Sequence, residues 1–194
     1  MSAKSIRICI SIVFITFLID SCSNNYTPKP LGYLRFDPPP PSYTPLVLNE
    51  LPYKFMISQY ASVEMPPQDS AEFWINIDYQ KFNAIIYCSY QGITPHSLPE
   101  YADECRKLVS RTVKHAVAIN ESVYEKDKGK VYGTLFEIEG ETASPIQFML
   151  TDSISNFFRG ALYFRCEPNT DSLAPYIDYL RKDVMELIQS FEWK

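Results

Sequence analysis

The feature that most limits the possible fold is a pair of apolar runs in the C-terminal half of the chain. Residues 146–150 and 161–164 are short and rich in aromatic side chains, and a polar centre at residues 151–153 follows the first run. Short runs of this composition, bounded by turn residues, are typical of β-strands. We therefore expect two neighbouring strands in a central sheet, joined by a longer connection that carries residues 157–159.

This connection holds the best candidates for a site. Asp152 and Arg159 stand at its two ends and can pair if the connection folds back. The pair is then either a structural clamp on the loop or a polar recognition spot beside Phe157 and Phe158. In the second case the two phenylalanines form an exposed partner surface.

The rest of the C-terminal part alternates between strand and helix patterns. Apolar residues at every second position predict further strands; they fall within residues 53–60, 73–79, 82–90, 122–124 and 130–139. A capping box at Ser97-Leu-Pro-Glu100 begins a helix whose apolar stripe extends to Val117, and a last helix runs from Asp171 to Phe191. This order predicts an α+β fold, in which two main helices pack on an antiparallel sheet, and it resembles the Mog1/PsbP-like sandwich.

Composition sets the size and excludes one class of partner. The 194 residues are 46% hydrophobic and 21% charged, which suits one packed domain with appendages. The net charge is −5 and no basic stripe is visible. Because phosphate binding needs clustered Lys and Arg, a nucleic-acid partner is not expected.

The N-terminus reads as a targeting segment. Lys4 and Arg7 precede an almost unbroken apolar run at residues 8–19, which has the length of a signal-peptide core and is too short to span a bilayer. The run ends in Ile-Asp-Ser-Cys, a bacterial lipobox pattern. We expect a signal peptide at residues 1–21 and a lipid on Cys22, which would anchor the mature chain to a membrane.

A proline- and tyrosine-rich stretch follows the anchor at residues 22–52. Proline fixes φ and removes a backbone donor, so we expect an extended tether without a regular ladder. It is either a free spacer or an arm docked on its own domain. The globular α+β domain is expected at residues 53–194.

The sequence contains no motif for metal, phosphate or nucleophilic chemistry. There is no Cys-x-x-Cys pair, no glycine-rich phosphate loop, no Gly-x-Ser-x-Gly and no His-Glu-x-x-His. Cys88 and Cys166 lie in apolar runs, so we expect both to be buried. Neither a metal nor a cofactor is expected, and no catalytic residue is assigned.

With these residues in hand, the chain resembles the gliding-motility lipoprotein GldD family of Bacteroidetes, from the lipobox to Trp193. The most specific part of the likeness is the Thr-Asp-Ser block followed by Arg-Gly-Ala-Leu-Tyr-Phe. The matching segments are Tyr26-Thr-Pro-Lys-Pro, Gly32-Tyr33, Trp74-Ile-Asn-Ile77, Lys81-Phe82-Asn83, Ser89-Tyr90, Gln147 to Ser153, Phe158 to Phe164, Pro168-Asn169 and Asp171-Ser-Leu173.

The resemblance implies a membrane-anchored, non-enzymatic component associated with gliding motility and type IX secretion, whose partners are other envelope proteins. Asn24 and Asn25 stand where an acidic export signal would be, so we expect the protein to face the periplasm. Two alternatives stay open. One is a periplasmic ligand-binding module with a pocket lined by tyrosines and phenylalanines, and the other is a hydrolase of envelope polymers.

Overall fold

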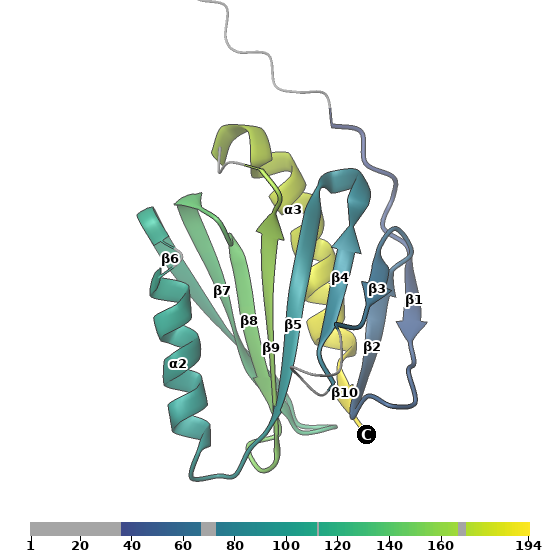
Figure 1. Ribbon diagram of the computed structural model, residues 1–194, viewed down its shortest axis with the longest axis vertical. Coiled ribbons are helices and arrows are strands. Elements are labelled where there is room, and N and C mark those ends of the chain that lie inside the picture. Colours follow the sequence, from purple (N-terminus) through teal and green to yellow (C-terminus); the bar gives the residue numbers. More distant parts are fainter. Residues whose placement is uncertain (1–35, 67–72, 112, 167–169) are drawn as a thin grey trace, which may run out of the picture. The chain divides into compact units, whose positions relative to one another are not determined.

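The computed structural model describes residues 36–66, 73–111, 113–166 and 170–194. These residues form two antiparallel sheets and two long helices (Figure 1). The predicted α+β class, with two main helices packed on antiparallel strands, is confirmed.

The larger sheet has seven strands, and every neighbouring pair is antiparallel. From edge to edge the strands are β3 (Ser62–Glu64), β4 (Ile75–Tyr79), β5 (Ala84–Gly92), β9 (Asn156–Phe164), β8 (Ile146–Thr151), β7 (Val131–Thr142) and β6 (Val113–Lys126). The expected strand pair β8–β9 therefore lies near the centre of the sheet. A single 3₁₀ turn, η1 (Gln80–Phe82), joins β4 to β5.

Successive side chains of the central strands point to opposite faces of this sheet, and a separate hydrophobic core lies on each face. In β9, Phe158 and Leu162 point into the larger core beneath α3 (Thr170–Ser190), whereas Phe157 packs into a smaller core with Cys105 and Val109 of α2 (Leu98–Arg111). Figure 1 shows the two helices on opposite faces of the large sheet. Each helix covers the sheet with its apolar stripe.

The smaller sheet joins the N-terminal part of the body to its C-terminus. Its strands are β1 (Tyr43–Leu46), β2 (Tyr53–Ser58) and β10 (Glu192–Trp193), with β2 in the middle. Tyr53 of β2 contacts Phe158 of the large sheet with ring centroids 4.7 Å apart, and Phe158 contacts Phe191 at 5.1 Å. The small sheet, the large sheet and the residue that follows α3 therefore share one aromatic core.

The folded body begins earlier than the boundary expected at residue 53. Strand β1 pairs with β2 from Tyr43 to Leu46, although its third residue is Pro45. Proline is tolerated there because β1 is an edge strand, so the expectation that no ladder forms before residue 53 is wrong. Phe36 also packs on the body, with its ring 4.2 Å from that of Tyr176. Of the two alternatives for the tether, the docked arm holds from residue 36 onward.

One helix is shorter than its apolar stripe predicts. Helix α2 ends at Arg111, and residues 113–117 belong to β6 instead, which pairs with β7 along its length. Two register shifts, between Val113 and His115 and between Ala116 and Ala118, show that the start of this strand is irregular. Val113, Ala116 and Val117 fit the spacing of a helix as well as that of a strand. Pairing with β7 selects the strand.

Cysteines and membrane spans complete the description of the body. Cys88 and Cys105 are buried free thiols, whereas Cys166 is exposed, so the expected burial holds for Cys88 and is wrong for Cys166. Among the described residues, no helix is both long and apolar enough to cross a membrane.

Candidate functional site

The connection between β8 and β9 is a tight loop organised by Asp152, and not the longer segment that the sequence predicts. Oδ1 of Asp152 accepts hydrogen bonds from the backbone N–H groups of Ile154, Ser155 and Asn156, at 2.9, 2.8 and 2.9 Å. Oδ2 accepts from the side chains of Ser155 and Asn156, at 2.9 and 2.7 Å. Aspartate is suited to this role because one carboxylate can satisfy several donors in a turn.

These bonds change the acidity of the carboxyl group. Partial burial alone raises the pKa of Asp152, but the backbone N–H groups of Asn156, Ile154 and Ser155 outweigh it and lower the pKa from 3.8 to about 2. The ionised form is therefore the one that closes the loop.

Arg159 belongs to a different network and does not pair with Asp152. Its Nη2 donates to Oε1 of Gln147 at 2.7 Å, which connects β9 to the neighbouring strand β8. Gln147 is completely buried, so it needs such a partner. The predicted clamp thus exists for Asp152 alone, through backbone groups.

The expected partner surface at Phe157 and Phe158 is wrong. Both residues lie in β9, and their side chains are only 5% and 0% exposed. Phe157 packs under α2, where its ring lies 5.7 Å from that of Tyr101, and Phe158 packs in the larger core. The predicted lipidation site, Cys22, lies outside the described residues.

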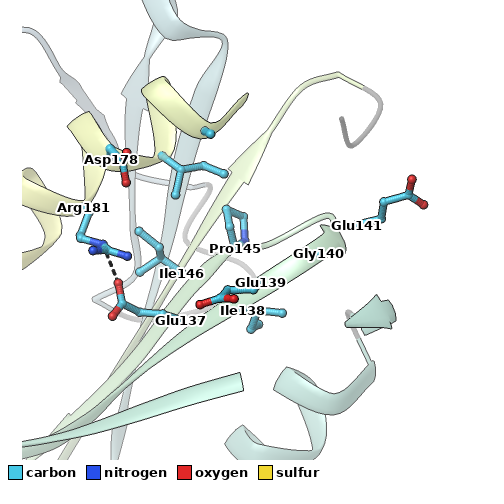
Figure 2. Close-up of a pocket in the computed structure, with 11 residues that line it drawn as sticks. Glu137, Ile138, Glu139, Gly140, Glu141, Pro145, Ile146, Asp178 and Arg181 are labelled. Carbon is cyan, nitrogen blue, oxygen red and sulfur yellow. Dashed lines mark ion pairs between the residues drawn. The ribbon is translucent and has the colours of Figure 1, made fainter. Parts of the chain in front are cut away.

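The body does have a groove, between α3 and the β7–β8 hairpin (Figure 2). Its volume is about 540 Å³. One wall is a stripe of α3 at helical spacing, formed by Ala174, Ile177, Asp178 and Arg181; the opposite wall and the floor are Glu137, Ile138, Glu139, Gly140, Glu141, Pro145 and Ile146. Contrary to the expected ligand pocket, no tyrosine or phenylalanine is among these lining residues.

Charged side chains from the two walls meet across the groove. Nε of Arg181 lies 2.6 Å from Oε1 of Glu137, and Figure 2 shows this ion pair bridging α3 and β7. Glu139 accepts a hydrogen bond from Nδ2 of Asn120 on β6, at 3.0 Å. At Gly140 the backbone adopts a φ of +111°, and the carboxylate of Glu141 points away from the ion pair.

No sequence motif marks these groove residues, although part of the signal for them is present in the chain. Glutamates at positions 137, 139 and 141 follow the period of a strand, which favours one shared face. Arg181, the partner of Glu137, lies 44 residues farther along the chain, and only the fold brings it alongside. In the described part of the chain, no group of three His, Cys, Asp or Glu side chains is placed to hold a metal ion.

A second polar cluster lies where β1 meets α3. Asp183 of α3 is only 4% exposed, and its Oδ1 accepts a hydrogen bond from the hydroxyl of Tyr43 at 3.0 Å. Burial raises the pKa of Asp183, and the hydroxyls of Tyr43, Ser58 and Tyr79 partly oppose this shift. Because Tyr43 is the first residue of β1, the cluster fastens the docked arm to the body.

Together the two-faced antiparallel sheet and the C-terminal helix define an α+β sandwich of the PsbP class. The solution structure of cyanobacterial PsbP (CyanoP) from Synechocystis sp. PCC 6803 is similar, with a TM-score of 0.51 and 10% sequence identity, over 86% of this chain and 100% of that chain. At this identity the likeness concerns the fold alone.

A model of one protein family matches almost the whole chain after residue 22. On the strength of that match, over residues 23–193, the chain belongs to the gliding motility lipoprotein GldD family. No curated protein sequence is detectably similar to it. Membership in a lipoprotein family implies that a lipid anchors the protein to the cell envelope.

Proposed function

We propose that this protein is a periplasm-facing lipoprotein that acts as a non-catalytic assembly component of the gliding-motility or type IX secretion machinery. The observation that carries the proposal is the family match, which spans both the tether and the body, residues 23–193. In this proposal the lipid holds the body at the membrane, and the body binds other envelope proteins.

The proposed anchor is Cys22, after removal of residues 1–21. Two or more acyl chains make membrane attachment stable, since each buried methylene contributes about 0.8 kcal/mol. Metabolic labelling with a fatty-acid analogue should mark the wild-type protein and leave the Cys22→Ala variant unlabelled. Equal labelling of the two proteins would exclude this anchor.

Three carboxylates of the body are already held by structural partners, which favours a binding role over acid–base catalysis at these positions. Asp152 is occupied by the loop that it closes, and Asp183 by Tyr43. Asp78, which is almost buried, forms an ion pair with Arg165 at 2.9 Å. Each of these carboxylates is fixed by structural partners, whereas a catalytic acid or base must face its substrate.

A ligand-binding module is the second candidate, and the groove is the observation that favours it. Its volume of about 540 Å³ lies within the range of small-molecule sites. A bound metabolite that co-purifies with the protein and lies in the groove would support this candidate.

The decisive experiment is genetic. Deletion of the gene should impair colony spreading or secretion of type IX cargo, and the wild-type gene should restore both, whereas the Cys22→Ala gene should not. Crosslinking in native envelopes should then recover motility or secretion proteins with the wild-type chain. A deletion strain that spreads and secretes normally would contradict the proposed role.

A further inference from the structure

The groove combines an apolar floor with an acidic rim. Ile146 and Pro145 are buried at its base, and Ile177 of α3 is half-buried above them. Glu139 and Asp178, from opposite walls, are exposed. Figure 2 shows their side chains on either side of the same hollow.

The charges on the rim are not balanced. Four carboxylates and one guanidinium line the groove, and the guanidinium of Arg181 is already engaged by Glu137. Within the described ranges, no ion pair joins Glu139 or Asp178 to a cation. A positively charged group that enters the groove therefore meets two available carboxylates, one from β7 and one from α3.

These properties select one kind of occupant. An uncharged apolar ligand would cover the carboxylates without pairing them, which is costly. An anionic lipid headgroup would be repelled. A peptide segment that carries both cationic and aliphatic side chains can pair with the carboxylates of the rim and pack on the apolar lining at the same time.

We propose that this groove binds an extended, basic segment of another envelope protein. A Lys or Arg of that segment lies between Glu139 and Asp178, and a neighbouring aliphatic side chain packs on the half-buried Ile177. The inference rests on the proposed function, because it gives the chemistry of the partner that such an assembly component would bind.

The binding test uses the full lipoprotein in mild detergent and a defined probe. The probe is a nine-residue peptide, Lys-Leu-Ser repeated three times, with blocked ends. One comparison peptide has Glu in place of every Lys, and another has Ser in place of every Leu. Calorimetric titration in low salt should detect binding of the first peptide and none of the Glu peptide, with weaker binding of the peptide without Leu.

Matched variants locate the binding. Glu139→Gln combined with Asp178→Asn should weaken binding about threefold to tenfold, because two exposed charge pairs are lost. The control, Glu104→Gln with Glu121→Gln, changes net charge equally on exposed residues outside the groove, and should bind like the wild type. Ala174→Phe, at an exposed rim position, should block the groove and reduce binding further.

The outcomes separate this inference from the function on which it rests. Equal losses in the groove pair and the control pair would mean nonspecific attraction to an acidic protein, and would overturn the inference. The inference would also be overturned if the Glu139→Gln, Asp178→Asn variant restored normal spreading and secretion to a defective deletion strain. In that case the assembly role would stand and the groove would not contribute to it. Loss of both peptide binding and complementation in the groove pair alone supports the inference.

Discussion

At the scale of single residues, Gly160 shows how closely the two central strands approach each other. It lies opposite Phe148 in the β8–β9 register, and a Cβ atom at position 160 would be 2.2 Å from the Phe148 ring. Phe148 is almost fully buried, so its ring has no open space into which it can move.

Gly160→Ala should therefore destabilise the protein by roughly 1–3 kcal/mol, the usual cost of overpacking a core. Urea unfolding measures this change. Gly92→Ala is the control, because nothing lies within 4 Å of a Cβ at that position, and its unfolding midpoint should stay close to that of the wild type. Equal midpoints for the two variants would contradict the packing argument.

Asp152 gives a prediction with a defined pH range. Its pKa is lowered from 3.8 to about 2 in the folded state, so its contribution to stability is complete above pH 4 and is lost as the pH falls toward 2. Asp152→Asn should be destabilised by about 1 kcal/mol at pH 6, and the difference from the wild type should shrink between pH 4 and pH 2. A difference that does not change with pH would exclude the ionised carboxylate as the loop-closing group.

The same residues mark where sequence reasoning fails. The predicted pair of Asp152 with Arg159 is wrong, because Arg159 bonds Gln147 and Asp152 bonds the N–H groups of its own loop, as aspartate in a turn does whatever the fold. The predicted exposure of Phe157 and Phe158 was wrong because it placed both residues before the start of β9. Pairing with the neighbouring strands β5 and β8 determines where β9 begins. Two adjacent phenylalanines can be buried together only in a strand covered on both faces, which the local pattern does not reveal.

At the scale of elements, the contact between β1 and α3 depends on a buried carboxylate. Tyr43→Phe removes the hydroxyl that donates to Asp183 and should cost roughly 1–3 kcal/mol at pH 7, since a buried acceptor loses its partner. Because the folded-state pKa of Asp183 is raised above 3.8, the penalty of its charge is greatest at neutral pH and decreases as the group is protonated. The cost of the substitution should accordingly be smaller at pH 4.

Hydrogen exchange locates the effect of Tyr43→Phe. Amides in β1 and the paired part of β2 should exchange faster in this variant, whereas those of α2 should not. Tyr87→Phe, at a half-exposed tyrosine on β5, is the control and should leave exchange in β1 unchanged. Protection of β1 that is equal in both variants would mean that Asp183 does not hold the arm.

The elements themselves were mostly predictable from the sequence. Strong apolar patterns predicted α3 and strands β4, β5, β7 and β8, and their antiparallel arrangement followed from short connections. Residues 113–117 were misassigned to a helix because Val113, Ala116 and Val117 continue the apolar stripe of α2. Pairing with β7 outweighs that local pattern, and no feature of the segment itself records the pairing.

At the scale of the whole molecule, the small sheet sets where the stable unit begins. A truncated chain that starts at residue 53 loses β1 and the Phe36 contacts, which exposes an edge of β2. It should melt at a lower temperature than a chain that starts at residue 35, and it should aggregate more readily. Equal melting temperatures would show that the arm adds no stability.

The groove belongs to this scale too, and for that reason the sequence could not predict it. Its walls come from β7 and α3, which are separated by β8 and β9 along the chain. The spacing of the glutamates indicates that they share one face of β7. The groove forms only because α3 leaves part of that face uncovered, and the sequence does not show this.

The docked arm also limits how far the protein can work from its membrane. If Cys22 carries the lipid and the body begins at Phe36, about 13 residues lie between them, and a chain of that length spans at most roughly 45 Å when fully extended. A free tether to residue 52 would have more than doubled that radius. With such a link, the surfaces of the body lie no farther from the lipid than the length of the link plus the length of the body itself.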